Sequence, residues 1–484
     1  MHRGTHYFET YSYSPEGSLI RTVIALALIL KWENVVWDIS TFYLHADRSK
    51  CLKLAVRLPK GFRMVNEYGE ELLGCLFSVL YGAPNSGYAA QQTLMSWMLE
   101  EFNTDGWRAV HSEVDPAISF IFNPAQEIAV IITYVDDVDS YGSNVEMLHE
   151  IKSRYDRRFG VKAGNREFML GVQRKIITYD DGTRGIHMTM ADYITELARE
   201  YEHDMPKKCP ATPWPPDLII GTKQESYQPS KSEQELYRNK GLLRLAGSLL
   251  WIARQCHAEI SFAASQVTSV MSMPSKVAWD AALGTLRWLV EHCDQGLLYR
   301  EQYSETIVSR DGVHQLDART LHGHTDSGHG TYDDGRAHGG HAIYLAGGPV
   351  TFTSKKLDIV TDSTLYSEYV QLHQCCRDVE MIKNFLTEMG PIADFITKEP
   401  TVIFCDNDTA TGLAHGRKRT PQSKHIAIKY HYIKQTVRQG TVDVRRVPTT
   451  DNRADLLLLL LLLLLLLLHA CAMAKLLEYA PEKK

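Results

Sequence analysis

The sequence has 484 residues, of which 44% are apolar and 23% are charged, and its net charge is −6. This ordinary globular composition supplies several hydrophobic cores, and the length predicts two to four domains. The acidic balance excludes a uniformly basic protein, so the total charge does not point to a nucleic-acid partner.

Charge is nevertheless unevenly distributed along the chain. Residues 152–175 carry eight basic residues against two acids, and residues 415–446 carry nine Lys or Arg, three His and one acid. Two local basic surfaces on an acidic chain suit an anionic polymer held near acidic, metal-binding centres. For either run alone, a solvated helix face is the simpler interpretation.

The first third of the chain predicts short strands and helices. The segment LIRTVIALALIL, residues 19–30, predicts a core helix that is too short to span a membrane. VVWDIST predicts a strand that ends at Asp38. IAVIIT, residues 128–133, predicts a buried strand, and DDVDSYG supplies turn chemistry after it. We therefore expect a β-hairpin with Asp136 and Asp137 at its tip, although a lone Asp-Asp pair is more often a solvated turn.

The middle of the chain is expected to be rich in helices. TYDDGTRG, residues 178–185, predicts a hairpin turn, and residues 190–202 predict an amphipathic helix. The prolines of residues 209–221 predict an extended connection. Residues 235–271 predict two helices and residues 275–293 a third, whereas the polar segment 309–320 is expected to be a linker.

The C-terminal part predicts a mixed α/β sheet with one acid on each element. Glycine-punctuated strands begin near Leu321, followed by a long helix that ends at Gly390, the strand TVIFCDN, a basic helix and the strand TVDVRRVP. The acids are Asp326, Glu368, Asp406 and Asp455. We expect the first three to converge, with Asp455 at the rim, although each acid alone is more often a surface charge or helix cap.

Clustered carboxylates of this kind predict metal-dependent phosphoryl chemistry. Acids that repel one another are stabilised by a divalent cation, and Mg²⁺ prefers a few carboxylates together with phosphate oxygens. Two ions at Asp38, Asp136 and Asp137 would serve nucleotidyl transfer by a 3′-hydroxyl. Two ions at the C-terminal acids would serve phosphodiester hydrolysis by water.

The tail contains thirteen consecutive leucines, residues 456–468. Such a helix would be about 20 Å long, short of the ~30 Å hydrocarbon core. A C-terminal membrane anchor is therefore not favoured, and a low-complexity expansion explains the run as well. The nine cysteines form no C-x-x-C pair, and the first residues are polar, so a cytosolic or nuclear setting is expected.

Taken together, these motifs resemble the reverse transcriptase–RNase H region of the Pol polyprotein of copia-type long-terminal-repeat retrotransposons. The resemblance extends from about Gly4 to Asp455, and it rests on the number, order and spacing of the motifs. They are YFETYSYSPEG, WDISTFYLHA, RLPKGF, LYGAPNSGY, YVDD, the segment YRNKGLLRLAGSLLWIA, SEY, CDN, SKHIAIKYHYI and NRAD.

The resemblance implies a fold, cofactors, partners and residue roles. The fold would be an α+β polymerase palm with a helical thumb or connection, followed by an α/β RNase H-like domain. The domains would be residues 1–180 (palm, fingers truncated), 181–308 (thumb or connection), 321–455 (RNase H-like) and 456–484 (polyleucine tail). Two Mg²⁺ ions per active site, or Mn²⁺ in their place, would act on an RNA template, a DNA primer, dNTPs and RNA–DNA hybrids.

The same resemblance assigns individual residues. Asp38, Asp136 and Asp137 would hold the polymerase metals, Tyr43 would be the aromatic gate under the sugar, and Asn85 would line the nucleotide. The RNase H metal ligands would be Asp326, Glu368, Asp406 and Asp455. For Tyr43, an ordinary core aromatic is an equally good interpretation.

The sequence departs from the family pattern in ways that leave alternatives open. Basic fingers strands that normally precede the palm are missing, which implies feeble polymerase activity beside measurable RNase H activity. Gly328 stands where the family often has an acid. The alternatives are a catalytically decayed remnant that at most binds nucleic acid, or RNase H activity alone. All seven acids are retained, which favours an enzyme.

Overall fold

The computed structural model describes residues 10–47, 54–76, 79, 81–216, 218–223, 227–360, 363–416 and 424–457. The chain divides into two compact units, one formed by Met1–Val23 and Leu30–Arg166 and the other by Ile24–Ile29 and Glu167–Lys484. The polyleucine run beyond residue 457 lies outside the described residues. The domain boundaries expected at residues 180, 308 and 321 stay predictions.

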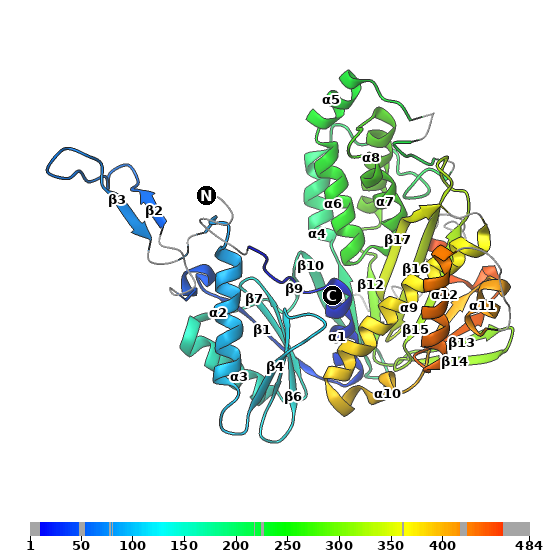
Figure 1. The fold of residues 1–484 in the computed structure, drawn as a ribbon, viewed down its shortest axis with the longest axis horizontal. Helices are drawn as coiled ribbons and strands as arrows, with labels where there is room; N and C mark the ends of the chain where they lie inside the picture. The colour runs from blue at the N-terminus through cyan, green and yellow to red at the C-terminus, as the bar shows by residue number, and fades with distance from the viewer. Residues whose placement is uncertain are drawn as a thin grey trace, which may run out of the picture. The chain divides into compact units, whose positions relative to one another are not determined.

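The first unit is built on a six-stranded sheet with the order β4-β5-β6-β7-β1-β8, in which every neighbouring pair is antiparallel (Figure 1). The strands are β1 (Glu33–Ile39), β4 (Arg108–His111), β5 (Ile118–Phe122), β6 (Ile128–Tyr134), β7 (Asp137–Gly142) and β8 (Val161–Ala163). The short strands β2 (Leu54–Arg57) and β3 (Leu73–Leu76) form a separate hairpin.

Helices α2 (Ser86–Glu101) and α3 (Val145–Phe159) pack on the six-stranded sheet. Trp37 of β1 is fully buried in the core that the sheet and these helices share, and its ring lies edge-on to Tyr155 of α3 at 5.1 Å. Alternate residues of β1 and β6 point to this face because side chains alternate along a strand. The predicted core helix is also present as α1 (Gly17–Ile29), whose apolar residues are buried.

The second unit begins with a four-stranded sheet and a group of helices. The sheet order is β12-β11-β10-β9, with β9 (Phe168–Met169), β10 (Val172–Thr178), β11 (Arg184–Thr189) and β12 (Leu297–Arg300). The predicted turn at residues 178–185 joins β10 to β11, which confirms that hairpin. The helices are α4 (Ala191–Glu200), α5 (Lys231–Asn239), α6 (Leu242–Gln255), α7 (Ser261–Ser269) and α8 (Lys276–Glu291).

Two sequence-based expectations about this middle region are wrong. Residues 235–271 form parts of three helices, not two, because Gly241 adopts φ +93° between α5 and α6 and the chain turns again after Gln255. The expected linker 309–320 belongs largely to a β-hairpin of β13 (Ser304–Ser309) and β14 (Gly312–Asp317). Ile307 and Leu316 are buried on one face of the hairpin, whereas Val308 and Val313 lie exposed on the other.

The C-terminal sheet has five strands in the order β17-β16-β15-β18-β19. The strands are β15 (His322–Gly328), β16 (Arg336–Leu345), β17 (Gly348–Val360), β18 (Thr401–Cys405) and β19 (Val442–Arg446). β15, β16 and β17 are antiparallel neighbours, whereas β15, β18 and β19 run parallel. The helices are α9 (Thr364–Glu388), α10 (Asp394–Thr397), α11 (Asp408–Ala414) and α12 (Lys424–Arg438).

This arrangement confirms the predicted fold class. The first unit has the antiparallel sheet and packed helices of an α+β palm, the middle is helical, and the last sheet is mixed α/β with helices between its parallel strands (Figure 1). No helix in the described part of the chain has the length and apolar character that a membrane crossing requires.

Candidate metal centres

The first candidate centre lies at one end of the sheet in the first unit. β6 and β7 form the predicted hairpin, closed by the pair Tyr134 and Asp137, with Val135 and Asp136 in the turn. Asp38 of β1 is the register partner of Asp137. Directly opposite residues of antiparallel strands share a face of the sheet, so these two carboxylates are neighbours.

The acids of this palm centre are half-buried and influence one another. Burial, and then the charges of Asp136, Asp38 and Asp139, raise the pKa of Asp137. The backbone also ties the turn to β1, since the amide of Ile39 donates to the carbonyl of Asp136 at 2.7 Å. Asp38, Asp136 and Asp137 therefore lie at one end of the sheet, and their role as metal ligands stays a prediction.

Tyr43 lies close to these acids, in a short 3-10 helix η1 (Phe42–His45) that follows β1. Burial, and then the charge of Asp136, raise the pKa of Tyr43, and its ring packs edge-on against Tyr81 at 4.7 Å. Asn85 is half-buried at the N-cap of α2, where its side chain makes no capping hydrogen bond. The nucleotide-binding roles of both residues stay predictions.

Asp139 is an acid of the same hairpin that was not singled out in the sequence. It is fully buried, and its carboxylate accepts hydrogen bonds from Asn34 Nδ2 at 2.5 Å and from Tyr141 Oη at 2.9 Å. The alternation of Asp137, Val138 and Asp139 along β7 could have indicated that Asp139 points to the same side as Asp137.

The second candidate centre gathers acids from four elements in or beside the C-terminal sheet. Asp326 lies on β15, Glu368 in the first turns of α9, and Asp406 directly after β18. Asp455 lies in η6 (Arg453–Leu457), a short 3-10 helix after β19. Because β15 and β18 are parallel neighbours, Asp326 and Asp406 leave the sheet at the same edge.

The four carboxylates of this nuclease centre converge. Oxygens of Asp326, Asp406 and Asp455 all lie within 4.8 Å of one another, and so do ligand atoms of Glu368, Cys405 and Asp406. The expected position of Asp455 at the rim is wrong, because Asp455 is only 1% exposed and Asp406 is the more exposed acid. η6 packs against β15 and β16, which carries Asp455 inward.

The electrostatics of this centre favour a bound cation. Burial, and then the charges of Asp326 and Asp406, raise the pKa of Glu368, and burial followed by the hydrogen bond with Asp326 raises the pKa of Asp455. Glu368 Oε2 and Asp455 Oδ1 are buried without a hydrogen-bond partner among the described residues. Orphaned carboxylate oxygens in a shared site fit a hard divalent cation such as Mg²⁺.

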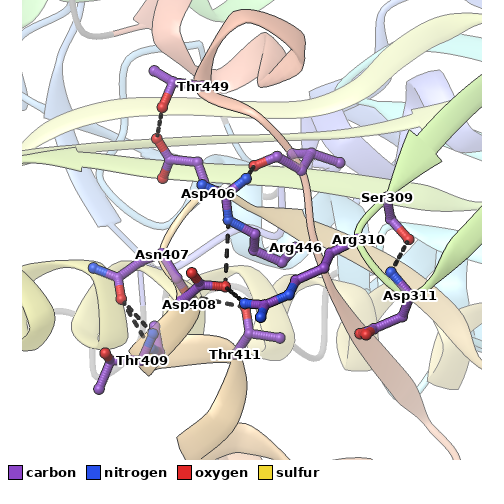
Figure 2. A network of polar contacts seen from close by, with 12 residues as sticks. Ser309, Arg310, Asp311, Asp406, Asn407, Asp408, Thr409, Thr411, Arg446 and Thr449 are labelled. Atoms are coloured by element: carbon purple, nitrogen blue, oxygen red, sulfur yellow. Dashed lines mark hydrogen bonds and ion pairs between the residues drawn. The ribbon is translucent and has the colours of Figure 1, made fainter.

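The Cys405 thiol belongs to the same cluster but differs chemically from its neighbours. It is fully buried, and burial raises its pKa well above the ordinary value for a thiol. A protonated thiol is a poor ligand for a hard cation, so the oxygen donors are the residues that fit magnesium. Thr449 Oγ1 donates to Asp406 Oδ2 at 2.9 Å and holds one of these donors (Figure 2).

The two basic surfaces expected from the sequence are not uniform positive faces. In the first run, Arg154 is 14% exposed beside Glu101 and Glu150, and Arg174 is buried. In the second run, Arg445 pairs with Asp443. Residues 417–423 lie outside the described residues. Local acids thus neutralise several of the cations on which the expectation rested.

Comparison with known proteins agrees with this arrangement. Residues 2–213 match the family model described as "Reverse transcriptase (RNA-dependent DNA polymerase)". The chain is 26% identical over 456 residues to the retrovirus-related Pol polyprotein from transposon RE2 of Arabidopsis thaliana and 27% identical over 459 residues to that from RE1. Each match covers 94% of this chain but only 28% of the relative.

Among solved structures, the foamy viral protease-reverse transcriptase in complex with RNA/DNA hybrid is similar over 89% of this chain and 46% of that one. The TM-score is 0.41 and the identity is 12%.

Proposed function

Because residues 2–213 carry a reverse transcriptase domain and 94% of the chain is related to Pol polyproteins of copia-type transposons, we propose that it is an RNA-directed DNA polymerase with a linked RNase H. The first unit would transfer nucleotides to a DNA primer on an RNA template. The C-terminal sheet would hydrolyse the RNA strand of the resulting hybrid.

In the palm centre, Asp38, Asp136 and Asp137 would hold the metal. Bound magnesium would supply charge neutralisation for the triphosphate and the primer hydroxyl. Tyr43 would stack beneath the sugar of a dNTP held at these acids, and the influence of the Asp136 charge on Tyr43 supports this role. This proposal is supported by the register pairing of Asp38 with Asp137 and by the closed turn that presents Asp136.

In the nuclease centre, Asp326, Glu368, Asp406 and Asp455 would hold the metal, with Mg²⁺ or Mn²⁺ as the ion. The single observation that carries the proposal is the convergence of four buried or half-buried acids, with two orphaned oxygens, from four separate elements. Four buried carboxylates this close together repel one another strongly when they are ionised. Such a cluster is stable only if a cation binds it or if some of the carboxylates are protonated.

The test measures both activities on the same purified chain. Mg²⁺-dependent cleavage of the RNA strand of a hybrid should fall at least about 100-fold in Asp406→Asn, because removing a ligand costs at least as much as removing a residue that supports one. Primer extension on an RNA template should fall similarly in Asp137→Asn. Each variant should leave the other reaction in place, so the two variants control each other.

Asp394→Asn is a further control, because this acid at the start of α10 pairs with Lys398 just after that helix and belongs to neither centre. If Asp406→Asn cleaves the hybrid as fast as the unaltered chain, the nuclease assignment is wrong. A chain that is folded but inert in both assays would be a catalytically decayed remnant.

Nuclease activity alone is a second candidate function, favoured by one observation. Within the described residues, the sets of ligand atoms that gather within 4.8 Å all belong to the nuclease centre, and the palm acids do not form such a set. Hybrid cleavage without primer extension would select this function.

A further inference from the structure

The β13–β14 hairpin, residues 304–317, packs against the strand that leads to Asp406. Ile307 and Leu316 of the hairpin are buried in one cluster with Phe404 of β18 and Val447, which follows β19. The amide of Arg310 at the tip donates to the carbonyl of Arg446 at 2.9 Å. The hairpin is thus fixed to the nuclease sheet by apolar packing and by its backbone.

The turn that carries Asp455 packs against β15 and β16, and specific polar contacts also hold it. It is a single 3-10 turn, and it is the last element that the structure describes. One anchor is Asn452, whose Nδ2 donates to the carbonyl of Thr325 at 3.0 Å, beside Asp326. Another is Ser354, whose Oγ donates to the carbonyl of Leu457 at 2.6 Å.

The third anchor joins this turn to the β13–β14 hairpin. The guanidinium of Arg453 forms an ion pair with Glu305 of β13. The same guanidinium donates to Tyr303 Oη at 3.4 Å and lies over the ring of Tyr344 at 5.2 Å. Tyr303 Oη also donates to Glu305 Oε2, so the second carboxylate oxygen is held as well.

A second link joins the hairpin tip to the segment after Asp406. Arg310 Nη1 lies 2.8 Å from Asp408 Oδ1, and Arg446 Nε lies 3.5 Å from the same oxygen (Figure 2). The side chains of Arg310 and Asp408 are 68% and 50% exposed, against 27% each for Glu305 and Arg453. Exposed ion pairs contribute little, so the link through Glu305 is the stronger of the two.

We infer that Glu305 is a positioning residue of the nuclease centre, which acts through Arg453 to hold the turn that places Asp455 among the metal-binding acids. The inference rests on the proposed nuclease function. Residues that orient a metal ligand without touching the metal typically change metal affinity by about 10–100-fold when they are altered. Glu305 lies on a strand outside the five-stranded sheet, so the β13–β14 hairpin becomes a functional part of the nuclease.

The test is the Mg²⁺ dependence of hybrid cleavage by the full chain. Glu305→Gln keeps the shape of the side chain and removes the charge that fixes Arg453. We expect the half-saturating Mg²⁺ concentration to rise about 10-fold, with the rate at saturating Mg²⁺ close to that of the unaltered chain. Calorimetric titration with Mn²⁺ should show the same weakening without relying on activity.

Three further variants separate positioning from simple destabilisation. Arg453→Gln and the double variant Glu305→Gln/Arg453→Gln should each show the same ~10-fold increase as Glu305→Gln, because coupled residues are not additive. The charge-exchanged pair Glu305→Arg/Arg453→Glu should recover part of the lost affinity. Thr306→Ala is the matched control, since it breaks only the exposed cross-strand bond from Thr306 Oγ1 to Gln315.

The outcomes that would overturn the inference are distinct. If the unaltered chain is active and Glu305→Gln shows the same Mg²⁺ dependence, the positioning role of Glu305 is rejected while the nuclease function stands. A loss of rate at all Mg²⁺ concentrations, with a lower melting temperature and no recovery in the exchanged pair, would assign Glu305 a merely structural role. An unaltered chain that neither cleaves hybrid nor binds Mn²⁺ would reject the nuclease function and this inference with it.

Discussion

The palm and nuclease centres use the same kind of side chain in opposite settings. Asp38 and Asp137 of the palm centre come from two neighbouring strands, face each other in register and are half-buried, and Asp136 lies in the turn beside them. The nuclease acids come from four elements, and Asp326, Glu368 and Asp455 are at most 6% exposed.

This difference in burial has an energetic consequence. In a low-dielectric interior, like charges repel more strongly and each charge loses more solvation. The nuclease centre therefore depends more on a cation, or on retained protons, than the palm centre does. In the palm centre the unfavourable feature is a strained backbone: Val135 adopts φ +57° in the hairpin turn.

The largest expected effect tests whether the buried position of Asp455 makes it indispensable. Asp455→Asn should reduce Mg²⁺-dependent hybrid cleavage at least about 100-fold, because a buried ligand has no mobile neighbour to replace it. Asp451→Asn alters an exposed acid four residues away and should cleave normally. Equal activity of the two variants would show that Asp455 is a peripheral residue.

The second effect compares how strongly a metal stabilises each centre. At a Mg²⁺ concentration 100 times the dissociation constant, a site present only in the folded state adds about 2.7 kcal/mol. Urea unfolding of the second unit, monitored through hydrogen exchange of the β15 amides, should show this increase in the free energy of unfolding when Mg²⁺ is added. The increase should be absent in Asp406→Asn. Retention of the full gain in Asp406→Asn would place the ion elsewhere.

The third effect is a change of stability with pH, caused by the buried histidine His338 near η6. His338 is fully buried, and burial lowers its pKa to about 3. A chain of hydrogen bonds can run from Gln266 through Tyr332, His338 and Ser354 to the carbonyl of Leu457 when His338 is neutral and protonated on Nε2. Protonation of His338 would reverse one of these bonds.

The pH dependence follows from the direction of this shift. The folded-state pKa lies below the unfolded value of about 6.5, so the contribution of His338 is present above pH 6.5 and is lost as pH falls toward 3. At pH 5.5 the loss is about 1.4 kcal/mol. His338→Gln should flatten the pH dependence of unfolding by this amount, and His203→Gln, at an exposed position, should not.

The smallest expected effect is at the palm. A β-branched residue with positive φ is strained by about 1 kcal/mol or more, whereas Asn tolerates this conformation. Val135→Asn should therefore slow hydrogen exchange of the β6 and β7 amides by an amount equivalent to about 1 kcal/mol. Val138→Asn, at a fully buried position of β7 with ordinary φ, should do the opposite.

Much of the fold could be predicted from the sequence because its signals are local. The apolar strand before Asp136 and the long helix that carries Glu368 each show their pattern within one continuous segment. The hairpin was also predicted, but its turn lies at Val135 and Asp136, and the expected turn residues Asp137–Gly142 form β7. The hairpin of β13 and β14 was not predicted, because its local signals were weak. Its Asp-Gly turn signal was present, but its strands are polar on one face and short.

The sequence by itself determined which acids are available and which strands and helices carry them. Only the tertiary structure decided that Asp455 is buried and not at the rim, and that Glu305 meets Arg453, 148 residues away. The physical reason is that periodicity and turn chemistry act within a few residues. Burial and ion pairing depend on how the sheet edge, η6 and the β13–β14 hairpin pack together, and no short segment encodes that packing.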